Sequence, residues 1–287
     1  MRSDLLELTA MGDDYRNYCW WPYQPVAPAT GKFRPSALLF HSFEVAGVNG
    51  KAFDLVRALQ QELGLFRTVY GVKWMGGRLA WEFYFYDYQR RERTVSVHRV
   101  LDAIRPLIRC DVKVNESLPY FMFSLDVTDS ILCEGRLDRV HLYIGNPGSR
   151  VSSGIAYAVG SANISLENFY FFFDAKRDSQ EAAGKVLCSA YLDATRTGIE
   201  RVLWPELCEC QTLCIANKQG NDTAYFSGVK VDQLLFFLGR LGYPGPVVRF
   251  VEGFRGQLDH LLYDVGFDYR GEGDGIRVIK SGFYGVF

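Results

Sequence analysis

The chain has 287 residues, 48% of them hydrophobic, and a formal net charge of −1, which fits one large domain or two ordinary ones with enough apolar residues for a sizeable core. The near balance of 32 basic and 33 acidic residues argues against nucleic-acid binding. No stretch approaches the roughly 18 apolar residues of a membrane helix, and the early acidic residues do not resemble a secretory signal, so we expect a soluble, cytoplasmic protein without a membrane span.

Residues 1–50 predict an irregular N-terminal extension. Within it, 19–35 contains four prolines and two tryptophans, a composition that indicates a loop or an aromatic plug. Residues 37–47 are compatible with an additional strand or with the start of a helix. Residues 51–64 carry apolar side chains at helical spacing and end on Gly64, which predicts a helix.

Five pairs of strand-like segments follow, and they are the most informative feature of the chain. Each pair consists of two runs rich in aromatic and β-branched residues. The pairs are 67–74 with 78–88, 118–127 with 139–145, 154–160 with 167–175, 210–218 with 223–229, and 265–270 with 275–287. Ten strands in antiparallel pairs can close into one barrel, and a barrel of that width can enclose a ligand.

Amphipathic helices are expected after several of these pairs. Residues 76–107 and 161–194 share one plan: a turn, an aromatic strand, an Asp, a charged turn and an amphipathic helix. Residues 220–242 are a looser third copy, and 246–266 predict one more helix. Similarity at this scale indicates a repeated unit within one structure.

These elements predict an α+β fold. We expect a closed antiparallel ten-stranded β-barrel of repeated strand pairs with helices on the outside. No stretch resembles a domain linker, so 1–287 should form a single domain, with 1–50 packing on the barrel of 51–287.

Alternation along the strands indicates which side chains face the inside of this barrel. If helices cover the apolar outer face, the other face carries tyrosines together with a cation on most strand pairs. The residues expected to line the lumen are Lys73, Glu82, Arg139, His141, Tyr143, Tyr170, Lys218 and Tyr225. On 118–127 the same alternation places on the inner face Tyr120, Met122, Ser124 and Asp126.

Two points about this inner face stay open. The last strand can present either Lys280 with Tyr284 or Arg277 with Ser281. The plainer alternative for the whole set is an ordinary sheet whose polar face meets water.

A lumen of this composition suits a particular chemistry. Several cations beside tyrosine hydroxyls can neutralise a diphosphate with directed hydrogen bonds. Aromatic faces can stabilise a carbocation and shield it from water. A carboxylate among them, Glu82 or Asp126, can act as a base or orient a nucleophilic arene.

Repeated strand pairs, outer helices and an aromatic lumen with Lys, Arg and Tyr on alternating positions together resemble the soluble aromatic prenyltransferases of the ABBA, or PT-barrel, type. The resemblance is architectural and covers residues 50–287. It implies transfer of a prenyl group from an allylic diphosphate to an aromatic acceptor inside the lumen. No cofactor is required on this interpretation, although Mg²⁺ can accompany the diphosphate, and we expect a monomer.

The resemblance also implies roles for individual residues. The basic strand residues of the family map onto Lys73, Arg139, Lys218 and Lys280, and its shielding tyrosines onto Tyr143, Tyr170, Tyr225 and Tyr284. The acidic residue that many members keep on an early strand maps onto Glu82, the expected catalytic residue, while His141 lies beside Tyr143 on the substrate-binding face. The chain has no DDxxD-like run, in agreement with the family. The short connection 146–153 departs from it, because the fold would place helices there.

Other functions remain alternatives. A non-enzymatic barrel for an apolar or aromatic small molecule needs a similar cavity, but several buried cations would be costly in it unless they are paired. A five-fold α/β propeller enzyme with a Cys nucleophile would need a nearby His, for instance Cys214 with His141 or His260. Residues 145–154 are glycine-rich but lack a nucleotide-binding signature.

The seven cysteines are an odd and scattered set. Cys208, Cys210 and Cys214 form the one local cluster, and no second ligand pair with zinc spacing accompanies them. We therefore interpret the cysteines as reduced structural thiols and expect no bound metal.

Overall fold

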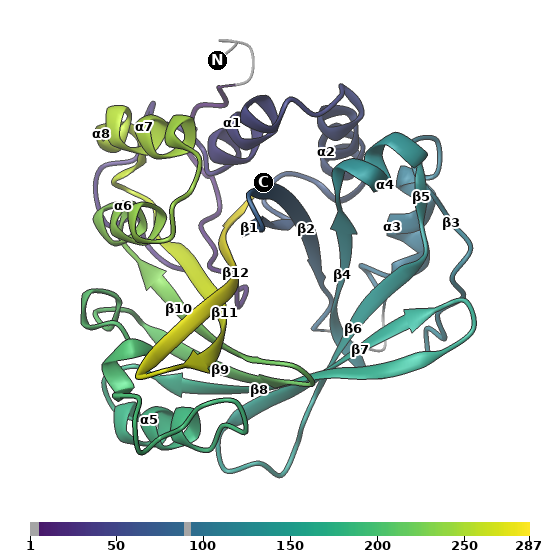
Figure 1. The fold of residues 1–287 in the computed structure, drawn as a ribbon. Coiled ribbons are helices and arrows are strands. Elements are labelled where there is room, and N and C mark those ends of the chain that lie inside the picture. Colours follow the sequence, from purple (N-terminus) through teal and green to yellow (C-terminus); the bar gives the residue numbers. More distant parts are fainter. Residues whose placement is uncertain (1–5, 89–92) are drawn as a thin grey trace.

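Ten antiparallel strands close into one barrel in the computed structural model of the protein, which describes residues 6–88 and 93–287 (Figure 1). The strands follow the chain around the circumference until β12 pairs with β1. Their bounds are β1 Val69–Met75, β2 Arg78–Tyr86, β4 Tyr120–Val127, β6 Arg139–Gly145, β7 Ser152–Gly160, β8 Ile164–Asp174, β9 Thr212–Lys218, β10 Asp222–Val229, β11 Tyr263–Glu272 and β12 Gly275–Val286. The expected closed ten-stranded barrel is confirmed.

Helices lie on the outside of the barrel (Figure 1). Within the described residues the α-helices are α1 Ser36–Ala46, α2 Lys51–Leu63, α3 Val97–Ile104, α4 Asp129–Glu134, α5 Ser179–Leu187, α6 Val231–Arg240, α7 Gly245–Gly253 and α8 Arg255–Leu258, with 3-10 turns at Ile199–Arg201 and Pro205–Leu207. The helices α3, α5 and α6 follow the first, third and fourth strand pairs, as predicted. None of the described helices is long and apolar enough to cross a membrane.

Three features of this arrangement differ from the expectation or resolve it. Of the two alternatives for residues 37–47, the helix is present, as α1. The prediction that all of 1–50 is irregular is therefore wrong for these residues. Helix α4 lies inside the second strand pair, beside a short parallel pair of strands, β3 Arg109–Cys110 and β5 Arg136–Leu137, that the sequence did not indicate. The strands β6 and β7 are joined without a helix, as the short connection predicted.

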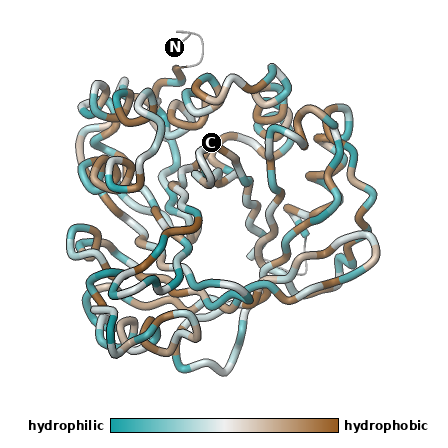
Figure 2. The backbone as a smooth tube through the Cα atoms, viewed as in Figure 1, coloured by the Kyte–Doolittle hydropathy of each residue, from teal (hydrophilic) through white to brown (hydrophobic). Residues whose placement is uncertain are grey.

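The outer face of the barrel is apolar because the helices cover it. On β2, Trp81, Phe83 and Phe85 are buried in the same hydrophobic core as the inner faces of α1, α2 and α3. Each such side chain stabilises the fold by about 1.5–3 kcal/mol relative to exposure. Trp81 also donates an Nε1–H hydrogen bond to Ser42 of α1 at 2.8 Å. Hydrophobic and hydrophilic residues alternate along the barrel strands (Figure 2), as their two-residue period requires.

A β-bulge changes this alternation at the start of β4. The register with β6 shifts between Tyr120 and Met122, and an inserted residue of this kind turns the neighbouring side chains to the opposite face. Tyr120 therefore packs outside, under the guanidinium of Arg93 at 3.7 Å, while Phe121 packs towards the inside. The prediction that Tyr120 faces the lumen is wrong for this reason.

The two repeated units share a turn that is organised by an aspartate. After β2, Asp87 accepts hydrogen bonds from Arg93 at 3.0 Å and from Thr94 at 3.2 Å. At the last position of β8, Asp174 accepts two backbone N–H groups of the following turn at 3.0 and 2.9 Å. The part of the first charged turn at 89–92 lies outside the described residues.

An aromatic plug formed by residues 18–21 inserts into one end of the barrel. The ring of Tyr18 lies inside, 4.6 Å from the ring of Tyr284, and its backbone N–H donates to the buried carboxylate of Asp264. Trp20 has a positive φ of 64°, and its ring stacks on that of Tyr86 at 5.3 Å. An aromatic plug is therefore present, and it begins at Tyr18, one position before the range that the sequence indicated, whereas Tyr15 packs on the outer core.

Candidate functional site

A cavity of about 560 Å³ occupies the lumen towards the end opposite the aromatic plug. Every residue that the sequence placed in the site reaches this cavity: Lys73, Glu82, Arg139, His141, Tyr143, Tyr170, Lys218, Tyr225, Lys280 and Tyr284. Arg139 stands at its exposed rim. The question left open for the last strand is resolved, because Lys280 and Tyr284 face the lumen whereas the Ser281 hydroxyl donates to Tyr243 in the outer layer at 3.2 Å.

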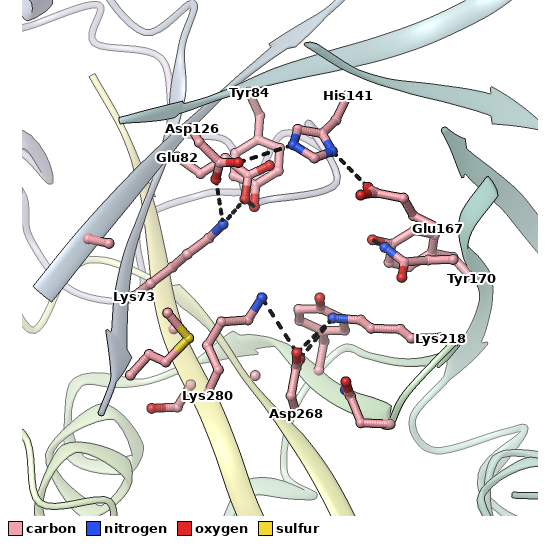
Figure 3. A pocket seen from close by; sticks show the side chains of 18 of the residues that line it. Lys73, Glu82, Tyr84, Asp126, His141, Glu167, Tyr170, Lys218, Asp268 and Lys280 are labelled. Atoms are coloured by element: carbon pink, nitrogen blue, oxygen red, sulfur yellow. Dashed lines mark hydrogen bonds and ion pairs between the residues drawn. The ribbon is translucent and has the colours of Figure 1, made fainter. Parts of the chain in front are cut away.

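One wall of the cavity is rich in carboxylates. Lys73 forms ion pairs with Glu82 and, at 3.2 Å, with Asp126. His141 lies between two carboxylates, with Nε2 3.1 Å from Asp126 and Nδ1 2.7 Å from Glu167. These five side chains, from β1, β2, β4, β6 and β8, form the carboxylate wall (Figure 3). Three acidic groups against two basic ones give this wall a negative balance.

The electrostatics of the carboxylate wall favour the ionised forms of Lys73, Glu82, Asp126 and His141. Burial favours neutral forms, but the hydrogen bonds from His141 to Asp126 and Glu167 outweigh it and raise the pKa of His141 to about 10. Burial is likewise outweighed at Lys73, whose pKa is raised by the carboxylates of Glu82 and Asp126. Burial alone would raise the pKa of the Glu82 and Asp126 carboxyls, but the charge of Lys73 holds both values below the usual range.

The opposite side of the cavity carries two lysines and one acid. Lys218 of β9 and Lys280 of β12 both contact Asp268 of β11, at 2.9 and 3.4 Å, and the Thr223 hydroxyl donates to the same carboxylate at 2.7 Å. These three charged residues form the lysine wall, which faces the carboxylate wall across the lumen (Figure 3). Its balance of charge is positive.

The pKa values of the lysine wall reflect this excess of cations. Burial lowers the pKa of Lys218, and the attraction of Asp268 does not compensate fully because Lys280 stands nearby. Burial alone would raise the pKa of the Asp268 carboxyl, but the two lysines lower it to about 2. Lys218 is therefore a buried ammonium that an additional anion would stabilise.

A closed ring of five tyrosines borders the cavity below the two walls. Going around this tyrosine belt, successive ring centroids lie 5.9 to 6.4 Å apart, within the range of favourable aromatic contacts. Its members are Tyr84, Tyr143, Tyr170, Tyr225 and Tyr284. Burial raises the pKa of each hydroxyl, so the belt consists of neutral phenols at physiological pH. The plug residue Tyr18 packs against its lower side.

Glycines on adjacent strands allow two belt tyrosines to lie flat against the sheet. Gly71 is paired with Tyr284, and Gly266 with Tyr225. A Cβ atom on Gly266 would lie 2.3 Å from the ring of Tyr225, and one on Gly71 2.7 Å from the ring of Tyr284. Any larger residue at these positions would push the ring away from the wall.

Sequence reasoning did not identify several residues of the site. Glu167 lies at the start of β8, where a bulge between Ala156 and Tyr157 of β7 shifts the pairing. Asp268 was detectable, because it shares a strand face with Gly266 and follows it by two positions. Nothing local indicated that Tyr18 would insert into the barrel, since its partners lie far along the chain.

The cysteines do not form a site in the described part of the chain. The closed barrel contradicts the propeller alternative, and burial raises the pKa of the Cys214 thiol, which disfavours its use as a nucleophile. Within 6–88 and 93–287, no group of three or more His, Cys, Asp or Glu side chains is arranged to hold a metal ion. Because Asp126 and Asp268 already contact cations, these carboxylates do not fit a resident Mg²⁺.

Comparison with known proteins adds no family to this description. No protein-family model matches the chain, and no curated protein matches its sequence.

Proposed function

We propose that the protein is an aromatic prenyltransferase, which transfers a prenyl group from an allylic diphosphate to an aromatic acceptor inside the lumen. The observation that carries this proposal is the closed tyrosine belt next to a wall with an excess of lysine charge. Such a reaction needs an anion site for the leaving group beside aromatic faces for a carbocation. The architectural resemblance to the ABBA-type enzymes supports the same reaction.

On the donor side, Lys218 and Lys280 receive the diphosphate. When the bond between the allylic carbon and the oxygen breaks, both electrons leave with the diphosphate, and the growing negative charge is held by these two ammonium groups. The allylic cation that remains faces the tyrosine belt, where each well-placed ring contributes about 0.5–2 kcal/mol through cation–π attraction. Because the belt phenols stay neutral, they do not capture the cation as phenolates.

On the acceptor side, the π electrons of the arene form the new carbon–carbon bond to the allylic cation. The arenium ion then loses a proton, which the carboxylate of Glu82 accepts. The lowered pKa of Glu82 makes it a weak base, but an arenium ion is acidic enough to transfer its proton to such a group. Lys73 and the Tyr84 hydroxyl, which donates to Glu82 at 2.7 Å, fix the position of this carboxylate.

The test is product formation from dimethylallyl or geranyl diphosphate with a panel of phenols, naphthols and indoles. We expect release of diphosphate together with a carbon-prenylated arene. Glu82→Gln should reduce turnover more than it reduces affinity for geranyl diphosphate, and Arg277→Gln, on an exposed position of β12, is the matched control. No binding of geranyl diphosphate by the wild-type protein would contradict the proposal.

The pairing of the lumen cations favours a second candidate. Lys73, Lys218 and Lys280 all contact carboxylates, so a neutral aromatic ligand can occupy the cavity without leaving them uncompensated. Non-enzymatic binding of an apolar or aromatic small molecule is therefore the alternative function. Stabilisation by inorganic pyrophosphate separates the two, because only the transferase has a use for that anion.

A further inference from the structure

A second cavity opens at the end of the barrel that holds the aromatic plug. Its volume is about 210 Å³. Its wall includes the C-terminal ends of β2 and β8, away from Glu82 and Glu167. Plug residues that include Trp21 also bound it. Tyr143 and Tyr170 line this apolar compartment and the charged cavity as well. These two belt tyrosines are therefore the boundary between the two spaces.

The two boundary tyrosines are oriented by polar partners on the charged side. The Tyr143 hydroxyl lies 3.2 Å from Ser124 Oγ and 3.5 Å from Glu82. The Tyr170 hydroxyl accepts a hydrogen bond from Asn168 at 2.9 Å. Their phenolic oxygens thus belong to the polar network, and their rings form part of the wall of the apolar compartment.

The lining of the apolar compartment selects the kind of ligand. Among the described residues around it, none carries a formal charge at neutral pH, and rings dominate the wall. The rings of Tyr88 and Phe121 stack at 5.6 Å with planes 11° apart, which gives one flat side. A charged ligand would find no counter-ion among these described lining residues and would lose its hydration, so they favour a neutral, planar molecule.

The volume limits the size of that molecule. A cavity of roughly 150 Å³ in another protein holds benzene, so 210 Å³ suits one or two fused rings. We propose that the apolar compartment binds a neutral arene of one or two rings, which reaches the tyrosine belt from the end of the barrel opposite the charged mouth. The identification of this arene as the prenyl acceptor rests on the proposed function, whereas its binding does not.

The test is calorimetric titration with 2-naphthol in the absence of any diphosphate. Gly154 lies on the inner face of β7, and a Cβ atom there would be 3.8 Å from Phe121, so Gly154→Val places two methyl groups in the compartment. We expect about a tenfold loss of naphthol affinity or more with unchanged affinity for pyrophosphate. Ile155→Val, on the opposite face of the same strand, is the control and should change neither affinity.

A second variant keeps the test decisive if Gly154→Val fails to fold. Phe172→Ala enlarges the compartment and should shift the preference from 2-naphthol towards a three-ring phenanthrol. Equal naphthol affinity in wild type and Gly154→Val, or no naphthol binding by wild type, would overturn the inference. Naphthol binding without prenyl transfer would overturn only the proposed function, and transfer that is indifferent to Gly154→Val would overturn only this site.

Discussion

Replacing Asp268 by Asn tests the lysine wall most sharply, because it removes the one acid that Lys218 and Lys280 share. Removing one partner of a buried ion pair costs about 3–5 kcal/mol. The Asp268 side chain is 8% exposed and that of Lys218 13%, whereas Lys280 is 30% exposed and can turn to water. We therefore expect a loss near the lower end, about 3 kcal/mol, which lowers Tm by roughly 6–12 °C.

The same change should strengthen anion binding. The carboxylate of Asp268 repels a diphosphate held by the two lysines, and at an effective dielectric constant of about 20 this repulsion amounts to about 3 kcal/mol at 5 Å. After allowing for the lost positioning of the lysines, we expect pyrophosphate to bind roughly 10- to 100-fold more tightly to Asp268→Asn than to wild type.

Thermal unfolding with and without saturating pyrophosphate measures both effects together. Asp268→Asn should unfold at a lower temperature than wild type without the ligand and should gain more from its addition. Asp126→Asn is the control, since it removes a partly buried acid from the carboxylate wall, where Lys73 still contacts Glu82. Equal gains from pyrophosphate in the two variants would refute the assignment of the lysine wall as the anion site.

Three further predictions follow from the described contacts. Lys218→Met should weaken pyrophosphate binding by about 1.5–3 kcal/mol, because it removes a charge-assisted partner. Arg139→Met, at the exposed rim, should weaken it by less than about 1 kcal/mol. Calorimetry that finds equal losses of affinity for the two variants would contradict this ranking. The charged form of His141 should stabilise the fold fully below pH 6.5 and lose this contribution as the pH rises towards its folded pKa of about 10. The difference in unfolding free energy between wild type and His141→Gln should therefore shrink between pH 6.5 and about 10; a constant difference would contradict the ion pairs described. Gly266→Ala should destabilise the fold by about 1–3 kcal/mol, because the new methyl group displaces the ring of Tyr225 that lies over this position. Gly253→Ala, in α7 with no neighbouring atom near its Cβ position, should stabilise the fold by up to about 1 kcal/mol. Equal denaturation midpoints for the two variants would contradict the packing described.

The residues of the lumen could be predicted because strands covered by helices obey a strict two-residue alternation. Lys73, His141 and Lys218 share strand faces with polar or small residues, while their neighbours on the opposite face are large and apolar. Once the outer face was known to be apolar, these cations had only the inside available. The alternation failed where a bulge interrupts it, as at Tyr120, because a bulge leaves no clear local signal in the sequence.

The pairing of charges could not be predicted in the same way. Glu82 and Asp126 lie on neighbouring strands, and their meeting with Lys73 depends on the register of β1, β2 and β4. The division into two walls depends further on the curvature of the sheet across β9 to β12, which brings Lys218 of β9 and Lys280 of β12 to the same carboxylate of Asp268 on β11. The insertion of Tyr18 rests on contacts with residues more than 60 positions away, and no local pattern encodes them.

The most direct test of the account is a crystal structure with a non-cleavable geranyl thiolodiphosphate and 2-naphthol. We expect the diphosphate to contact Lys218 and Lys280 inside the lumen and the geranyl chain to lie along the tyrosine belt. A diphosphate bound on the outer surface, or a lumen that stays free of the analogue at saturating concentration, would contradict it.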